Sequence, residues 1–110
     1  MKIREFVNEE KRTCVVVLED CHQYFMTKIH KRLRSFGYSI PYKWLYFPDK
    51  FGGKAKCSPE DEFDADIGLS LARDRAFKLY TRTWNRKIEF LIEKHRFIVE
   101  NIYALRKEVE

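Results

Sequence analysis

The chain has 110 residues, enough for a single domain with one hydrophobic core. Its composition is 45% apolar and 15% aromatic, which excludes the disordered and fibrous classes of protein. It carries 22 basic and 17 acidic residues, and this net charge of +5 favours anionic partners: nucleic acid, nucleotides or acidic protein surfaces. The plain alternative is a soluble basic protein whose charges bind nothing.

Hydropathy and cysteine usage give an expected location. The longest purely apolar run, Val15 to Leu18, is too short to span a membrane, and no signal peptide is visible at the charged N-terminus. Three cysteines without C-x-x-C spacing (Cys14, Cys21 and Cys57) indicate reduced thiols. We therefore expect a cytoplasmic protein without a membrane partner.

The first 36 residues predict a hairpin and a short helix. Ile3 to Val7 alternates loosely and Thr13 to Leu18 is β-branched, with a polar turn between them. The unbroken apolar run in the second strand suggests that both of its faces are covered. A helix over 20–36 follows, with Asp20 as its N-cap and Gly37 as its stop signal. One face of this helix is strongly basic, with Lys28, Lys31, Arg32 and Arg34.

The middle of the chain mixes aromatic and basic side chains. Tyr42 to Phe47 has β character, and Lys54 to Cys57 predicts a short strand running back beside it. Ser58 to Asp61 has the pattern of a single helical turn. The aromatic faces could stack a base while lysines hold phosphate, or they could belong to the core. The residues concerned are Tyr42, Trp44, Tyr46 and Phe47, with Lys43, Lys50, Lys54 and Lys56.

The stretch from Asp64 to Glu110 predicts one long helix, with Asp64 as its N-cap, no proline and Gly68 as its only glycine. Read as one helix it is roughly 70 Å long, more than the remaining chain can cover. We therefore expect its apolar seam to mediate a homodimer or a higher oligomer. The seam residues recur in steps of three and four: Phe77, Tyr80, Trp84, Ile88, Leu91, His95, Ile98, Ile102, Leu105 and Val109.

Other positions on this helix have more than one interpretation. His95 could face its copy across a dimer and titrate near neutral pH, or it could be a hydrogen-bonded histidine that sets the register. Gly68, Ala72 and Ala76 form a small-residue face that another backbone can approach closely. Arg73 projects to the covered side, where it needs either the acidic segment 60–64 or an anionic ligand.

A basic strip follows one face of the same helix. Arg75, Lys78, Arg82 and Arg86 fall together at about 100° per residue. The strip could meet several phosphates, or it could be a solvated face that keeps the helix soluble.

Recognisable catalytic constellations are lacking in the sequence. Gly52-Gly53 lacks both the strand-to-helix context and the Gly-Lys-Ser/Thr of a phosphate loop. The cysteines and histidines match no metal-ligand spacing, and capping explains the paired acids. We expect no enzymatic activity, no cofactor and no metal.

The run from Lys54 to Asp64, followed by Gly68, Leu71-Ala72 and Arg75-Ala76, resembles a pattern in small phage-encoded proteins of Gram-positive bacteria. In that pattern an A-x-C-x-P-x-D-x-F-D segment leads into a long helix with G-x-x-x-A-x-x-R-A. The architecture also resembles the anti-Thoeris sponge family, whose long helices assemble and which sequester a cyclic ADP-ribose-type signal. This resemblance implies that arginines near the start of the helix bind phosphate.

The sequence thus predicts an α+β fold over residues 1–110, with a small antiparallel sheet head (1–63) that includes the basic helix and a long C-terminal helix (64–110). Its favoured function is non-enzymatic sequestration of a phosphate-bearing nucleotide in phage counter-defence, in the cytoplasm of an infected bacterium. The predicted ligand residues are Arg73, Arg75, Lys54, Lys56, Lys78, Arg82 and Tyr46. The alternative is a nucleic-acid-binding protein or an anti-CRISPR-type inhibitor that blocks a nuclease, using Lys28, Lys31, Arg32, Arg34 and Arg86.

Overall fold

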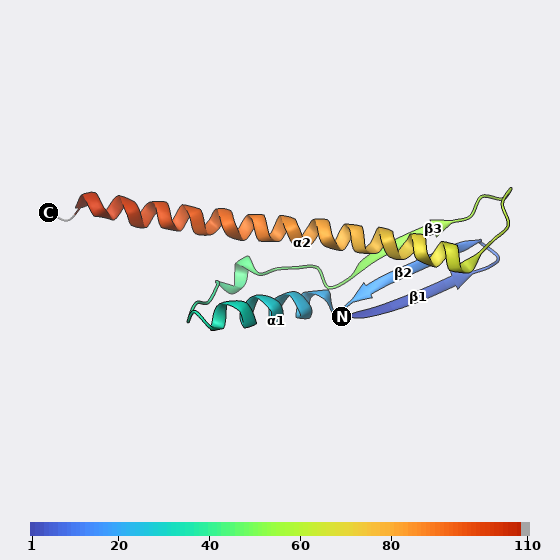
Figure 1. Ribbon diagram of the computed structural model, residues 1–110, viewed down its shortest axis with the longest axis horizontal. Helices are drawn as coiled ribbons and strands as arrows, with labels where there is room; N and C mark the ends of the chain where they lie inside the picture. The colour runs from blue at the N-terminus through green and yellow to red at the C-terminus, as the bar shows by residue number, and fades with distance from the viewer. Residues whose placement is uncertain (109–110) are drawn as a thin grey trace.

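The computed structural model describes residues 1–108 and has an α+β arrangement, as predicted (Figure 1). Its long axis measures 77 Å against 24 and 18 Å for the other two. The long axis follows the C-terminal helix, which extends well past everything else in the chain (Figure 1). In chain order the elements are β1 (Lys2–Asn8), β2 (Thr13–Glu19), α1 (Cys21–Arg34), the 3-10 turn η1 (Tyr42–Trp44), β3 (Phe51–Lys56), α2 (Ala65–Ala104) and the 3-10 turn η2 (Leu105–Glu108).

The three strands form one antiparallel sheet in the order β1-β2-β3, so the predicted hairpin is confirmed. Along β2 every second side chain is buried: Cys14, Val16 and Leu18 face α2, while Val15 and Val17 are only half-buried. The expectation that both faces of this strand are covered is therefore wrong. Its apolar run reflects β propensity on a half-covered sheet, because α2 packs on one face only.

The predicted pairing of the third strand is also wrong. β3 starts at Phe51 and pairs with β2, whereas the aromatic segment forms the 3-10 turn η1 and an irregular stretch. Leu45 and Phe47 are each 1% exposed and enter the core, while Tyr46 between them is exposed. Because alternate residues of this segment are buried, its sequence has the pattern of a strand although it pairs with no other strand.

Helix ends follow the sequence signals only in part. Asp64 caps α2 as predicted, accepting hydrogen bonds from the N–H groups of Asp66 and Ile67. Gly37, with φ of +65°, follows the end of α1 as expected. Asp20 precedes α1 with a φ of +61°, in the left-handed region and not in the extended region usual for an N-cap, and its side chain makes no capping hydrogen bond. Ser58 to Asp61 forms a hydrogen-bonded turn and not a helical one.

The small-residue face of α2 lies directly against the sheet, which confirms the expected close approach. A Cβ atom added at Gly53 would clash with the Ala72 carbonyl oxygen and lie 2.6 Å from the Ala76 nitrogen. One added at Gly68 would lie 2.5 Å from the Cys14 Sγ. The first turns of α2 are therefore fixed on the sheet by backbone proximity.

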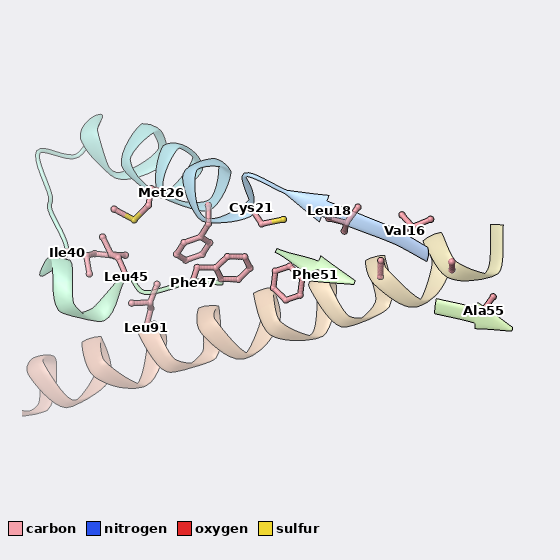
Figure 2. Close-up of a cluster of buried hydrophobic side chains, with 13 residues drawn as sticks. Val16, Leu18, Cys21, Met26, Ile40, Leu45, Phe47, Phe51, Ala55 and Leu91 are labelled. Carbon is pink, nitrogen blue, oxygen red and sulfur yellow. The ribbon is translucent and has the colours of Figure 1, made fainter. Parts of the chain in front are cut away.

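The core continues from the sheet into the space between α1 and α2 (Figure 2). Phe25 of α1 stacks on Phe47 with 4.7 Å between ring centroids, and Trp84 of α2 meets Phe25 edge-on at 5.1 Å. Leu91, 6% exposed, is the last buried residue of α2 in the described chain. We call residues 1–91, which contain the sheet, α1, η1 and the part of α2 that packs on them, the head.

Candidate interaction surfaces

The basic residues of α1 form a surface of the head that carries positive charge only. Residues 21–48 contain five of the 22 basic residues and none of the 17 acidic ones, so the rest of the chain has seventeen of each. The net charge of +5 is thus contributed entirely by this segment. The side chains of Lys28, Lys31, Arg32 and Arg34 are exposed, and none forms an ion pair in the described part of the chain.

Two shallow recesses flank this surface. One, of about 340 Å³, is lined by Lys28, Lys31, Arg32 and Ser35. The other, of about 610 Å³, includes Lys31 and Arg34 and is bordered by the ring of Tyr42, which is 74% exposed. Cations and an aromatic face therefore lie side by side here. These cations belong to α1 and are not the ones that the sequence suggested as neighbours of the aromatic segment, which were Lys43, Lys50, Lys54 and Lys56. We call the four basic residues with Tyr42 the basic face.

The two arginines near the start of α2 already have partners within the chain. Arg73 is exposed, so the expectation that it projects to the covered side is wrong. It pairs with Glu5 of β1 at 2.6 Å and not with the acidic segment 60–64. Arg75 donates a hydrogen bond to the Lys54 carbonyl oxygen of β3. β1 and β3 are the opposite edges of the sheet, so within one chain the two arginines do not line a common recess.

The lysines of β3 lie on yet another surface. Lys54 and Lys56 are exposed, while Phe51, Gly53 and Ala55 are buried toward α2. The lysine side chains therefore project from the open face of the sheet. The other predicted ligand residues are exposed at separate places: Tyr46 in the loop before β3, and Lys78, Arg82 and Arg86 along α2.

A recess of about 430 Å³ at the start of α2 has the wrong charge for phosphate. Lys56 lines it together with the acidic residues Asp61, Glu62 and Asp64. Arg12 fixes the adjoining loop by donating hydrogen bonds to the Ser58 and Asp61 carbonyl oxygens. Three carboxylates around one ammonium group repel an anionic ligand.

The predicted seam divides into two parts. Phe77, Tyr80, Trp84 and Ile88 pack on the core of their own chain, and Leu91 is buried in it. His95 Nδ1 lies 2.6 Å from the Leu91 carbonyl oxygen, and its ring lies beside the rings of Tyr38 and Trp44. Only the seam residues beyond His95 lack such cover: Ile102 and Leu105 are each 59% exposed and Ile98 is partly exposed. Val109 lies outside the described residues.

Sequence reasoning missed an apolar groove between α1 and α2, which we call the α1–α2 groove. Its volume is about 590 Å³, and ten residues line it: Ile29, Arg32, Leu33, Phe36, Tyr38, Ile40, Ile88, Leu91, Ile92 and His95. Phe36 is 76% exposed on its rim. The signal was present, because Ile29, Leu33 and Phe36 keep the period of α1, but periodicity alone does not say that the faces of two helices leave a gap between them.

The described residues offer little reactive chemistry. Burial raises the pKa of the Cys21 thiol to about 11 and also raises the pKa of Cys14, which disfavours the nucleophilic thiolate. The described residues contain no group of three His, Cys, Asp or Glu side chains that could hold a metal ion. Among the described helices none is both long and apolar enough to cross a membrane.

Comparison with known proteins adds no relative. A scan against protein-family models finds no match, and searches of curated proteins and of solved structures find none either.

Proposed function

We propose that this protein is a non-catalytic binding protein that engages the phosphates of a nucleic acid through the basic face of α1. One observation carries the proposal: the whole net charge of +5 comes from residues 21–48, and the α1 cations are exposed and unpaired within the described chain. A surface that only keeps a protein soluble usually mixes both signs of charge. A surface of one sign attracts a polyanion and orients its approach.

The aromatic neighbours of the cations support single-stranded nucleic acid in particular. Tyr42 is 74% exposed beside Lys31 and Arg34, and Tyr24 is 37% exposed on the same helix. Exposed aromatic rings beside cations can stack bases while the cations meet the backbone.

Self-association through α2 is part of the proposed function, because a dimer presents two basic faces to one polymer and gains avidity. The sponge resemblance adds a second ligand class, a small phosphate-bearing nucleotide, and a role in phage counter-defence in the bacterial cytoplasm. The arginines expected to hold such a nucleotide, Arg73 and Arg75, are engaged by Glu5 and the Lys54 carbonyl, so the nucleic-acid surface has more support.

The test is a binding titration by fluorescence anisotropy with labelled single-stranded DNA and RNA of mixed sequence, repeated over a range of salt concentrations. We expect the affinity to fall steeply as salt rises, because bound cations release counterions from the phosphates. The double variant Lys31→Glu with Arg34→Glu should abolish binding.

The control variant is Arg82→Glu with Arg86→Glu, which makes the same change of charge on the α2 strip. We expect it to weaken binding only slightly. Equal losses in both variants, or no binding of either polymer at low salt, would reject the basic face as the site. Saturable binding of a cyclic nucleotide that survives the Lys31→Glu, Arg34→Glu change would favour the second ligand class.

A further inference from the structure

The end of α2 projects from the head without cover. Beyond His95, the sheet, α1 and η1 have all ended, while α2 continues (Figure 1). We call residues 96–108 the tail. Phe97 is 67% exposed, and Ile102 and Leu105 are each 59% exposed. A short helical end without packing is marginal in water, and a row of exposed apolar side chains indicates an interface.

The apolar stripe of the tail continues the floor of the α1–α2 groove. Ile88, Ile92 and His95 line the groove. At about 100° per residue, Ile98 and Ile102 fall on the same side of the helix as these three. A single stripe therefore begins in the groove, beside Phe36 and Leu33 of the opposite wall, and runs out along the tail.

The groove and the uncovered seam of the tail have the same length along the helix. The groove spans residues 88–95 of α2, and the uncovered seam spans 98–105. Both segments lie at equal distances from the point between residues 96 and 97. A two-fold axis at that point places Leu105 of a second copy opposite Ile88 of the first chain. It also places Ile98 of the second copy opposite His95 of the first chain. Each tail then fills the groove of the other chain, and one self-complementary interface forms.

The open grooves favour this antiparallel register over a parallel one. The antiparallel register joins residues whose numbers sum to 193, so Leu91 lies opposite Ile102 of the second copy and an apolar side chain is contributed by each helix. A parallel register places both basic faces at one end of the dimer, where they repel, and leaves both grooves open.

We propose that the α1–α2 groove binds the tail of a second copy of this chain, in an antiparallel dimer with its two heads at opposite ends. This proposal specifies the self-association that forms part of the proposed function. The apolar surfaces of the groove, of Phe36 and of the tail are exposed in a single chain. All three are buried when two chains pair in this way.

The first test measures oligomeric state by sedimentation velocity at micromolar concentration. The wild-type protein should be a dimer, and Ile102→Asp and Phe36→Asp should each give a monomer. Both side chains are exposed, 59% and 76%, so the head should stay folded, which far-UV circular dichroism checks. Glu100→Lys is the control: this side chain is exposed and lies on the far side of α2 from Ile98 and Ile102, so its variant should remain a dimer.

The second test measures orientation. A spin label at Lys107→Cys, with Cys57→Ser to remove the half-exposed native thiol, gives one distance per dimer by double electron–electron resonance. The antiparallel arrangement separates the two labels by roughly 21 residues of helix, about 30 Å. A parallel pair would hold them near the interhelical distance of about 10 Å.

A wild-type monomer would overturn the proposal and leave the groove to a helix of another protein. If Phe36→Asp still dimerises, or if the label distance is short, the tail of the second copy does not bind in the α1–α2 groove. The monomeric variant Ile102→Asp also separates this proposal from the proposed function. Its basic face is intact, so it should still bind nucleic acid, with lower avidity, whereas Lys31→Glu with Arg34→Glu should dimerise and not bind.

Discussion

The two halves of α2 carry the same apolar period in different surroundings. The first half lies on the sheet through Ala72 and Ala76, so closely that Gly53 has no room for a side chain. The second half carries large side chains, and Ile102 and Leu105 near its end are each 59% exposed. The comparison teaches that a helical period identifies a face to be covered but does not say which chain covers it.

The largest contrast should come from two phenylalanines. Phe47→Ala removes a ring that is 1% exposed and packed on Phe25, and it should lower the free energy of unfolding by about 3–5 kcal/mol. Phe97→Ala removes a ring that is 67% exposed, and it should change the free energy by less than about 0.5 kcal/mol. Urea denaturation at fixed protein concentration measures both. Similar losses would contradict the division between the packed half of α2 and the tail.

Adjacent glycines test the close contact of α2 with the sheet. Gly53→Ala places a methyl group against the backbone of Ala72 and Ala76, which cannot yield cheaply, and should cost about 2–3 kcal/mol. Gly52→Ala meets nothing within 4 Å and should be nearly neutral. Thermal unfolding of the two variants provides the measurement. A tolerated Gly53→Ala would mean that α2 lies farther from β3 than described.

Alkaline pH should lower the stability of the head at a lower pH than it affects the tail interface. Burial raises the pKa of the Cys21 thiol from 9.0 to about 11 and that of the Tyr80 hydroxyl from 10.0 to about 12. The unfolded chain therefore loses these protons first. Their contribution to stability is complete below about pH 9 and is lost as the pH rises through about 11 to 12.

The measurement for this prediction is the free energy of unfolding in urea between pH 8 and pH 11, with an expected fall on the order of 2 kcal/mol. Cys21→Ala should flatten part of that slope. An equally steep slope in the Cys21→Ala variant would show that the thiol is not the responsible group.

The smallest effect should come from the rim of the head. Arg73 and Glu5 form an exposed ion pair at 2.6 Å, with side chains 50% and 38% exposed. Solvent screens such pairs, so a double-mutant cycle with Arg73→Ala and Glu5→Ala should give a coupling below about 1 kcal/mol. A much larger coupling would indicate that this pair positions α2 on β1.

The sequence sufficed for features that local chemistry determines. The β-branched hairpin, the Asp64 cap and the small-residue face of α2 are all present as predicted. The basic side of α1 was also readable, because the absence of acidic residues between Cys21 and Pro48 is visible in the sequence itself.

Features that depend on distant contacts were not predictable. The partner of Arg73 is Glu5, 68 positions away, and only the angle of α2 across the sheet brings them together. β3 pairs with β2, and the aromatic segment that the sequence suggested as the partner of β3 instead places Leu45 and Phe47 in the core. The α1–α2 groove likewise depends on how far apart the two helices lie, and no period encodes that distance.

Hydrogen–deuterium exchange, read by mass spectrometry over a dilution series, tests most directly whether a second chain covers the tail. The dimer account predicts that amides in residues 97–104 are protected at high concentration and lose protection on dilution and in Ile102→Asp. Amides of β2 and of the first half of α2 should be protected at every concentration. Tail protection that is equal in the wild-type protein and in Ile102→Asp at all concentrations would contradict the account.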